Sequence, residues 1–313
     1  MTLLLRRLGA TVPVLLLVTA GVFALLHLTP GDPIDAMMAE SVDATAKETL
    51  RRDLGLDRPI AVQYAAWMGR LLRGDLGRSI RNGEPVVENV SRRIRPSLQL
   101  AAMAMALSLL IAVPVGMVSA YRRNTTVDRV SSGCALLGIC MPNFLLALLL
   151  IFFFGVTLRW LPISGYTDPL EDPVHGVRSL VLPAVALGLA LAAVVTRTLR
   201  SSLLEALTED YVRTARAKGL SEWRIMRGHV LKNALIPVVT VLGLQLGTLI
   251  GGAVITEYVF ALPGVGRLVV DAVFARDYPL VQGVVLLIAV GFILSNLLVD
   301  LVYGWIDPRI RRY

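Results

Sequence analysis

Six long apolar runs constrain what this chain of 313 residues can fold into. A helix of about 20 consecutive apolar residues crosses the hydrocarbon core of a bilayer, whereas one of about 10–14 residues does not. Each run is expected to be helical, because lipid offers no hydrogen-bonding partner to an irregular backbone. The sequence therefore predicts an all-α membrane protein with six transmembrane helices, near residues 9–28, 98–121, 130–156, 180–199, 236–256 and 282–303.

The basic residues gather at alternate ends of these runs. The chain has 31 Lys and Arg against 23 Asp and Glu, and a net charge of +8 would also suit a nucleic-acid-binding protein. However, they cluster before the first run, between the second and third, between the fourth and fifth, and after the sixth, as is typical of cytoplasmic loops. We therefore expect both termini and the segment 205–237 to face the cytoplasm, and no nucleic acid as a partner.

The pattern divides the chain into three parts. Residues 1–28 are predicted to form an uncleaved first span, because the apolar run exceeds the 7–15 residues of a signal peptide and no A-x-A-like site follows. Residues 29–97 are predicted to form an extracytoplasmic helical loop. Residues 98–313 are predicted to form a transmembrane core of five helices, which includes a cytoplasmic elbow at 205–237.

The loop 29–97 is expected to hold three short helices after a rigid turn at 29–33. Asp43 can cap the first, which would run to Gly55. The second begins at Pro59, a residue suited to the first helical position, and the third at Pro85. The sequence leaves open whether these helices lie on the outer leaflet, cover the mouth of a channel, or pack against neighbouring spans.

Polar side chains within the apolar runs are costly in lipid and are expected to face protein or water. Asn143, Gln245 and Asn296 are therefore candidates for lining a translocation pathway. A hydrogen bond between helices is the alternative for all three. That alternative is preferred for Asp300, which shares a helix face with Asn296 and lies near the cytoplasmic end of its run.

Prolines and glycines in the runs predict local backbone features. Pro114, Pro142 and Pro183 can each kink a helix, because proline removes a backbone hydrogen bond. Glycines at 243, 247 and 251 form a stripe that permits close helix contact. The partner in that contact would be either a second membrane subunit or another helix of this chain.

The elbow at 205–237 is longer than a connection between two spans requires. Residues 205–218 predict a helix that continues from the fourth span, and Gly219 is placed to end it. Ser221 can cap a second helix, which would run to Pro237, where the fifth span begins. A solvated charged face is the usual explanation for such a segment. Apolar residues that would seek a partner argue against it, namely Ala215, Ala217, Leu220, Trp223 and Ile225.

This elbow resembles the cytoplasmic EAA loop of the transmembrane subunits of binding-protein-dependent ABC importers. The string Tyr-Val-Arg-Thr-Ala-Arg-Ala-Lys-Gly at 211–219 is typical of the peptide branch of these importers. There, an arginine replaces the glutamate of the general motif and would present a cation to the partner. Of the positions in that motif, Ala215, Gly219 and Leu231 agree, and Arg213, Thr214, His229 and Lys232 differ.

Further stretches are similar to the B-type permease of the dipeptide/oligopeptide/nickel import family, and their order and spacing are specific. They lie at residues 29–33, 54–57, 74–77, 257–260, 263–264, 277–279 and 307–309. The resemblance implies a type I ABC importer permease fold in the cell inner membrane, with an outer helical insertion after the first span. It also implies that the elbow couples to an ATPase through Glu209, Asp210, Arg213, Ala215, Arg216, Lys218, Gly219, Ser221 and Arg224.

The partners implied by the resemblance are a second homologous permease, two ATP-binding subunits, an extracytoplasmic substrate-binding protein and the lipid bilayer. ATP and Mg would be bound by the ATPase subunits, and this chain would hold no cofactor or metal. The expected cargo is a di- or oligopeptide, with nickel, glutathione or haem as alternatives within the family.

Other classes of function find less support in the residues. None of the three lysines lies in a Gly-x-x-x-x-Gly-Lys-Ser/Thr loop, so the chain itself is not expected to hydrolyse ATP. An ion-gradient-driven secondary transporter needs intramembrane carboxylates or a histidine relay, for which Asp300 is the only acidic candidate. An intramembrane enzyme needs a Ser/His or paired-aspartate arrangement, which the runs do not offer.

Overall fold

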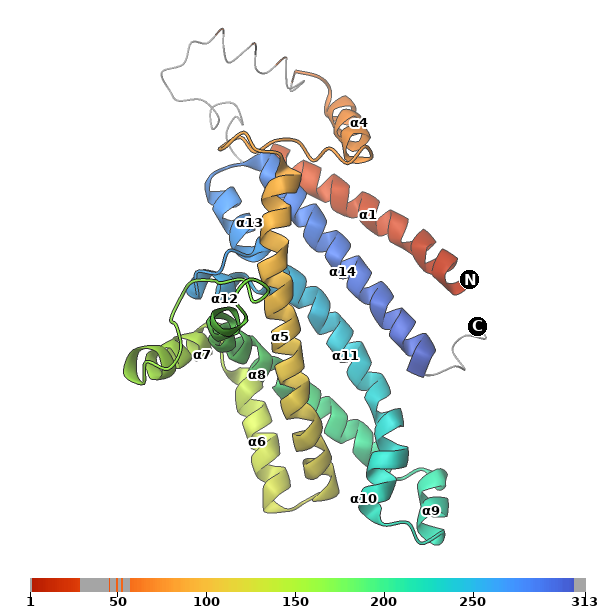
Figure 1. Ribbon diagram of the computed structural model, residues 1–313. Coiled ribbons are helices and arrows are strands. Elements are labelled where there is room, and N and C mark those ends of the chain that lie inside the picture. The colour runs from red at the N-terminus through yellow and green to blue at the C-terminus, as the bar shows by residue number, and fades with distance from the viewer. Residues whose placement is uncertain (1, 29–44, 46–48, 50–51, 53–56, 307–313) are drawn as a thin grey trace. The chain divides into compact units, whose positions relative to one another are not determined.

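The computed structural model describes residues 2–28, 45, 49, 52 and 57–306 of the chain (Figure 1). Throughout this part the regular elements are helices, and an isolated bridge joins Arg78 to Pro85. The predicted all-α class is confirmed. The chain forms two compact units, Met1–Arg95 with Gly264–Gly291, and Pro96–Pro263 with Phe292–Tyr313. The division into 1–28, 29–97 and 98–313 stays a prediction.

The first unit is built from helices near both ends of the sequence. It contains α1 (Thr2–Leu28), α4 (Ile60–Leu71) and α13 (Val265–Phe274), with the first parts of α5 (Val86–Tyr121) and α14 (Tyr278–Ile306). Two apolar clusters stabilise it by removing these side chains from solvent. One gathers Val86, Val90, Val265, Leu268, Ala272, Leu280 and Val284, and the other gathers Phe23, Trp67 and Leu286.

A buried carboxylate fixes the start of α14 in this unit. Asp277 is 1% exposed and accepts hydrogen bonds from the Leu280 N–H at 3.3 Å and the Ile80 N–H at 3.1 Å. The Ser79 hydroxyl also donates to it. The carboxylate therefore satisfies an otherwise unpaired N–H of the first turn of α14 and holds the 79–81 loop against that turn.

The outer helices differ in part from the sequence expectation. Pro59 occupies the position just before α4, with extended backbone, rather than its first helical position. The helix expected from Pro85 is the start of α5, which runs on to Tyr121 as one element of 36 residues. The Asp43–Gly55 helix and the turn at 29–33 fall largely outside the described residues.

The second unit is arranged around α8 (Pro173–Ala206). Most side chains of α8 between Gly176 and Leu203 are buried, and it packs against α6 (Thr126–Cys140), α7 (Asn143–Leu150) and α11 (Leu231–Gly252). η1 (Ile151–Thr157) continues α7, and α12 (Val254–Val259) packs against α7 and α8. In Figure 1, α8 runs from beside α7 to the end of the unit that carries α9 and α10.

Of the three prolines expected to kink a helix, Pro142 lies at a strong bend. The third predicted span is broken at Met141–Pro142, and its two halves are bent by 103°. Met141, which directly precedes Pro142, has extended backbone, because the proline ring disfavours helical geometry at the residue before it. Pro114 and Pro183 lie inside α5 and α8, which continue past them as single helices.

Four described helices are long and apolar enough to cross a membrane, and the bent pair provides a fifth if it counts as one span. The four are Val86–Tyr121, Pro173–Ala206, Glu222–Leu249 and Tyr278–Val299. The predicted first span coincides with α1, whose described apolar helix, Thr11–Ala24, is shorter. The chain is thus a multi-pass membrane protein by length and composition of its helices.

The glycine stripe packs within this chain. A Cβ added to Gly243 would lie 1.8 Å from the Cγ2 of Val299, and one added to Gly247 would lie 2.4 Å from the Cδ2 of Phe292. Both neighbours belong to the second part of α14, so the small residues allow α11 and α14 to approach closely. Of the two explanations that the sequence left open, contact within the chain accounts for these two glycines.

Candidate functional site: the polar elbow

The elbow consists of one short helix and a turn that leads directly into the next span. α8 ends at Ala206, and α9 (Asp210–Ala217) begins after a three-residue turn. α10 (Glu222–Ile225), η2 (Met226–Val230) and α11 then follow without interruption as one helix, Glu222–Leu249.

Two sequence expectations about the elbow helices are therefore wrong. Residues 205–218 do not form one helix, because the Thr208 N–H and hydroxyl both bond to the Glu205 carbonyl, at 3.0 and 2.7 Å, and close a turn there. The second helix does not stop at Pro237, which lies inside α11. The loss of a single hydrogen bond at that proline does not end a helix that is supported by its neighbours.

Gly219 makes the sharp turn between α9 and α10, as predicted. Its φ is +77°, in the left-handed region that favours glycine. The Gly219 N–H bonds to the Arg216 carbonyl at 2.9 Å, and the Leu220 N–H bonds to the Ala215 carbonyl at 3.3 Å. These bonds satisfy the last carbonyls of α9, as a terminating glycine allows. Ser221 stands at the cap position of α10 with extended backbone, but its side chain makes no capping hydrogen bond.

The apolar side of the elbow is packed inward. Ala215 is 8% exposed, and Val212 and Ile225 are fully buried in one cluster with Leu199 and Leu203 of α8. The expectation that Ala215 and Ile225 form an exposed surface is therefore wrong. Their burial fixes α9 onto the end of α8 and the start of α11.

Two aromatic side chains of the elbow remain on the surface. Trp223 is 44% exposed and meets the ring of Tyr121 edge-on, with centroids 5.7 Å apart. Tyr211 on α9 is 37% exposed. Leu220 is half-buried and Ala217 is exposed. The outward apolar surface is thus smaller than the sequence suggested and rests mainly on these two rings.

An ion pair spans the turn at Gly219. Arg216 donates from Nε to Glu222 Oε1 at 2.6 Å and from Nη2 to Glu222 Oε2 at 3.1 Å. This two-pronged hydrogen bond raises the pKa of the Arg216 guanidinium above its usual value. Arg216 is therefore engaged within the elbow and joins α9 to α10.

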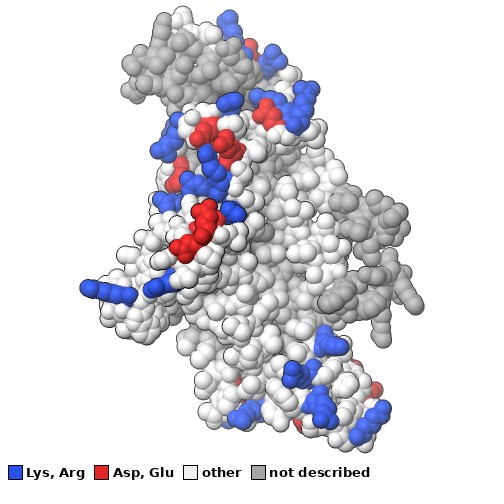
Figure 2. Space-filling view, in the orientation of Figure 1, with Lys and Arg blue, Asp and Glu red and all other residues white. Residues whose placement is uncertain are grey.

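The other predicted coupling residues point outward. The Arg213–Asp210 pair is 3.4 Å long, with side chains 77% and 95% exposed, so it contributes little to stability. Glu209, Lys218 and Arg224 are exposed. Figure 2 shows basic side chains gathered over the surface around α9 and α10. The elbow thus offers a firmly held, mainly basic outer face.

Sequence reasoning missed a partly buried ion pair close to the elbow. Asp128, in the first turn of α6, is 4% exposed and receives Arg200 Nε at 2.6 Å and Nη2 at 2.8 Å. The Ser119 hydroxyl donates to the same carboxylate at 2.6 Å, and the Asn124 N–H donates at 2.9 Å. These bonds fasten the α5–α6 turn to α8 just before α8 reaches the elbow. Nothing in the local sequence signals a pairing between residues 72 positions apart.

A second buried carboxylate lies within the 257–260 stretch that carried part of the family resemblance. Glu257 on α12 is 1% exposed, and the Ser97 hydroxyl of α5 donates to its Oε1 at 2.6 Å. The contact holds α12 beside α5 in the second unit. The sequence singled out this stretch by similarity, without assigning the carboxylate a contact.

The three residues predicted to line the pathway lie on three different helices, α7, α11 and α14. Asn143 is exposed at the first position of α7, immediately after the 103° bend. Gln245 and Asn296 are half-buried on α11 and α14. The Thr248 hydroxyl lies 3.4 Å from Gln245 Oε1, and within the described chain no hydrogen bond connects any two of the three candidates. Those described residues also include no group of three His, Cys, Asp or Glu that could hold a metal.

Comparison with solved structures gives the fold. The fold matches a chain of the MetNI methionine ABC transporter in an inward-facing form, with a TM-score of 0.58 at 20% identity, over 69% of this chain and 95% of that one. A second crystal form of that transporter gives a TM-score of 0.56. The chain therefore has the all-α fold of a type I ABC importer permease.

Sequence comparison then gives the family. Residues 112–312 match the binding-protein-dependent transport system inner membrane component, and residues 1–101 match its N-terminal membrane component. The chain belongs to this family. A Sinorhizobium fredii protein named as a peptide ABC transporter permease is 42% identical, and a Brucella suis protein named as a peptide permease is 46% identical. The dipeptide transport system permease DppB of Alkalihalophilus pseudofirmus is 40% identical. In each case 98% of both chains is covered.

Proposed function

We propose that this chain is the permease subunit of an ATP-driven ABC importer for di- or oligopeptides, and that it forms half of the translocation pathway. The observation that carries the proposal is the elbow: a short helix whose apolar face is locked onto two spans and whose basic face points outward. A helix held in this way transmits a displacement instead of absorbing it. The peptide cargo rests on the names of relatives that are 40–46% identical over the whole chain.

The partners follow from the family. A second homologous permease completes the pathway, two ATPase subunits bind ATP and Mg and face the elbows, and an extracytoplasmic binding protein delivers the cargo. ATP binding brings the ATPases together, the elbows move with them, and the spans alternate between inward-open and outward-open states. This chain supplies the lever and does not itself hydrolyse ATP.

The predicted coupling residues divide into two roles in this proposal. The exposed side chains of Glu209, Asp210, Arg213, Lys218 and Arg224 contact the ATPase. Ala215, Arg216, Gly219 and Ser221 instead give the elbow its shape, through burial, the Glu222 ion pair, the left-handed turn and the extended backbone before α10.

Reversing one exposed charge tests the docking role. We expect Arg213→Glu to reduce co-purification of the ATPase by about tenfold or more, because a like-charge contact at an interface costs several kcal/mol. The matched control is Arg123→Glu, which reverses the charge of another exposed arginine, on the α5–α6 turn. Peptide uptake by vesicles that hold all subunits should fall with the first variant only. If Arg213→Glu recovered as much ATPase as wild type, the proposal that this face of the elbow contacts the ATPase would be wrong.

The distribution of basic residues among the loops predicts that the elbow and both termini lie on the cytoplasmic side of the inner membrane. A cysteine at Lys218, in a background without Cys134 and Cys140, reports on this directly. We expect a membrane-impermeant maleimide to label it in inside-out vesicles and not in right-side-out vesicles. The opposite labelling pattern would exclude the proposed coupling.

Asn143, Gln245 and Asn296 are proposed to line the pathway in the assembled importer. Gln245 gives the cleanest test, because its side chain is half-buried and, among the described residues, it accepts a hydrogen bond from Thr248 at the long distance of 3.4 Å. We expect Gln245→Leu to change the KM for peptide uptake severalfold without changing the melting temperature of the purified chain. A change in melting temperature with an unaltered KM would instead make Gln245 a contact between helices.

A further inference from the structure

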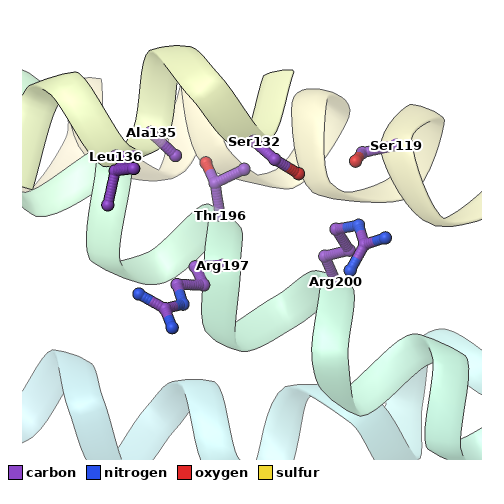
Figure 3. A pocket seen from close by; sticks show the side chains of 7 residues that line it. All are labelled: Ser119, Ser132, Ala135, Leu136, Thr196, Arg197 and Arg200. Atoms are coloured by element: carbon purple, nitrogen blue, oxygen red, sulfur yellow. The ribbon is translucent and has the colours of Figure 1, made fainter. Parts of the chain in front are cut away.

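A cavity of about 260 Å³ opens between α6 and α8. Figure 3 shows the side chains that line it. Its polar lining comes from Ser119 on α5, Ser132 on α6, and Thr196, Arg197 and Arg200 on α8. Ala135 and Leu136 of α6 form the apolar wall. Two arginines on α8, a helix long enough to span a membrane, thus lie beside an apolar wall. The family resemblance assigns no role to this arrangement.

Of the two arginines of the cavity, Arg200 forms an ion pair with a carboxylate and Arg197 forms none with the described residues. Arg200 is neutralised by Asp128 through the two hydrogen bonds already described. Arg197 is exposed and makes no ion pair or hydrogen bond within the part of the chain that the structure describes. In Figure 3 its side chain extends away from that of Arg200. The cavity therefore carries one uncompensated positive charge.

An unpaired guanidinium within an apolar helix is costly unless an anion or water meets it. Arginine matches phosphate geometry with two parallel hydrogen bonds. The hydroxyls of Ser132 and Thr196 line the same cavity. One positive charge matches the single negative charge of a phosphodiester. The chemistry of the cavity is thus that of a phosphate site.

The surroundings of the cavity distinguish a lipid from a free phosphate. Leu136 is 55% exposed and Leu137 is 67% exposed, and Val130 and Ile139 on the same helix are also exposed. On a helix of a pair that can span a membrane, exposed aliphatic side chains are suited to contact acyl chains rather than water. The cavity therefore places a cation beside a lipid-facing wall, which fits one molecule that has both an anionic headgroup and acyl chains.

We propose that the Arg197 cavity binds the headgroup phosphate of an anionic phospholipid, whose acyl chains lie along α6. Because Arg200 is tied to Asp128 at the same place, the bound lipid sits against the helix that leads into the elbow. The site is independent of the cargo and of ATPase docking, so its test does not require the assembled importer.

The test measures lipid affinity of the purified full chain in neutral detergent by native mass spectrometry. Phosphatidylglycerol is compared with phosphatidylcholine, which has no net charge. We expect wild type to prefer phosphatidylglycerol by about tenfold, since a hydrogen bond to a charged group contributes roughly that factor. Arg197→Gln should bring the ratio close to one, whereas Arg197→Lys should retain most of it by keeping the charge.

Arg227→Gln is the matched control, because Arg227 is an exposed arginine on η2 that loses the same charge. It should leave the preference for phosphatidylglycerol unchanged. A preference that survives Arg197→Gln would overturn the proposal. Glycerol 3-phosphate should raise the melting temperature less than phosphatidylglycerol at the same concentration. An equal rise would show a site for soluble phosphate and would overturn the lipid assignment.

Discussion

Asp128→Asn is expected to lower the free energy of unfolding by about 3 kcal/mol. The substitution removes a carboxylate that is 5% exposed and leaves the Arg200 guanidinium, whose side chain is 28% exposed, without its counter-charge. Removing one partner of a buried pair costs about 3–5 kcal/mol, and the partial exposure of Arg200 places the effect at the lower end. The midpoint of thermal unfolding of the purified full chain in detergent measures the change.

Two further variants separate the ion pair from a general effect of substitution. Asp128→Asn combined with Arg200→Gln should recover part of the loss, because no uncompensated charge remains. Asp210→Asn breaks a 3.4 Å pair whose side chains are 77% and 95% exposed, and should change stability by less than about 1 kcal/mol. If Asp128→Asn proved as mild as Asp210→Asn, the α5–α6 turn would not be fastened to α8 through this pair.

The apolar runs predicted the membrane-spanning helices because the length and composition that a spanning helix needs are properties of each run by itself. Length and composition were sufficient for α5, α8, α11 and α14, which need no knowledge of their neighbours. The prediction of one continuous third span was wrong at Pro142, because a proline can produce either a gentle kink or a full break in a helix. The 103° bend depends on how α7 packs against α8 and α12, and a single run does not contain that information.

The elbow shows the same limit on a smaller scale. The turn at Gly219 was predictable, because the left-handed backbone is a local property of glycine. The burial of Ala215 and Ile225 was not, because their partners, Leu199 and Leu203, lie on a different helix. The pairing of Asp128 with Arg200 was hidden for the same reason. Long-range contacts thus decided which of the predicted elbow residues remain exposed.

The second large effect is expected from Gly219→Val, which should uncouple ATP hydrolysis from peptide uptake. A Cβ at this position would meet no atom within 4 Å, so the substitution acts through the backbone and not through a clash. A non-glycine residue in the left-handed region costs about 1–2 kcal/mol, and a β-branched one more. Valine would therefore shift the backbone at 219 and displace α9 relative to α10, while the buried contacts of Val212 and Ile225 keep the chain folded.

Gly219→Asn is the matched control, because asparagine tolerates the left-handed region far better than valine. In vesicles that contain all subunits, the valine variant should move roughly tenfold less peptide per ATP hydrolysed, and the asparagine variant should stay close to wild type. The ratio of uptake to hydrolysis separates a coupling defect from poor assembly, since poor assembly lowers both rates together. An unchanged ratio in Gly219→Val would mean that force reaches the spans by a route other than the turn between α9 and α10.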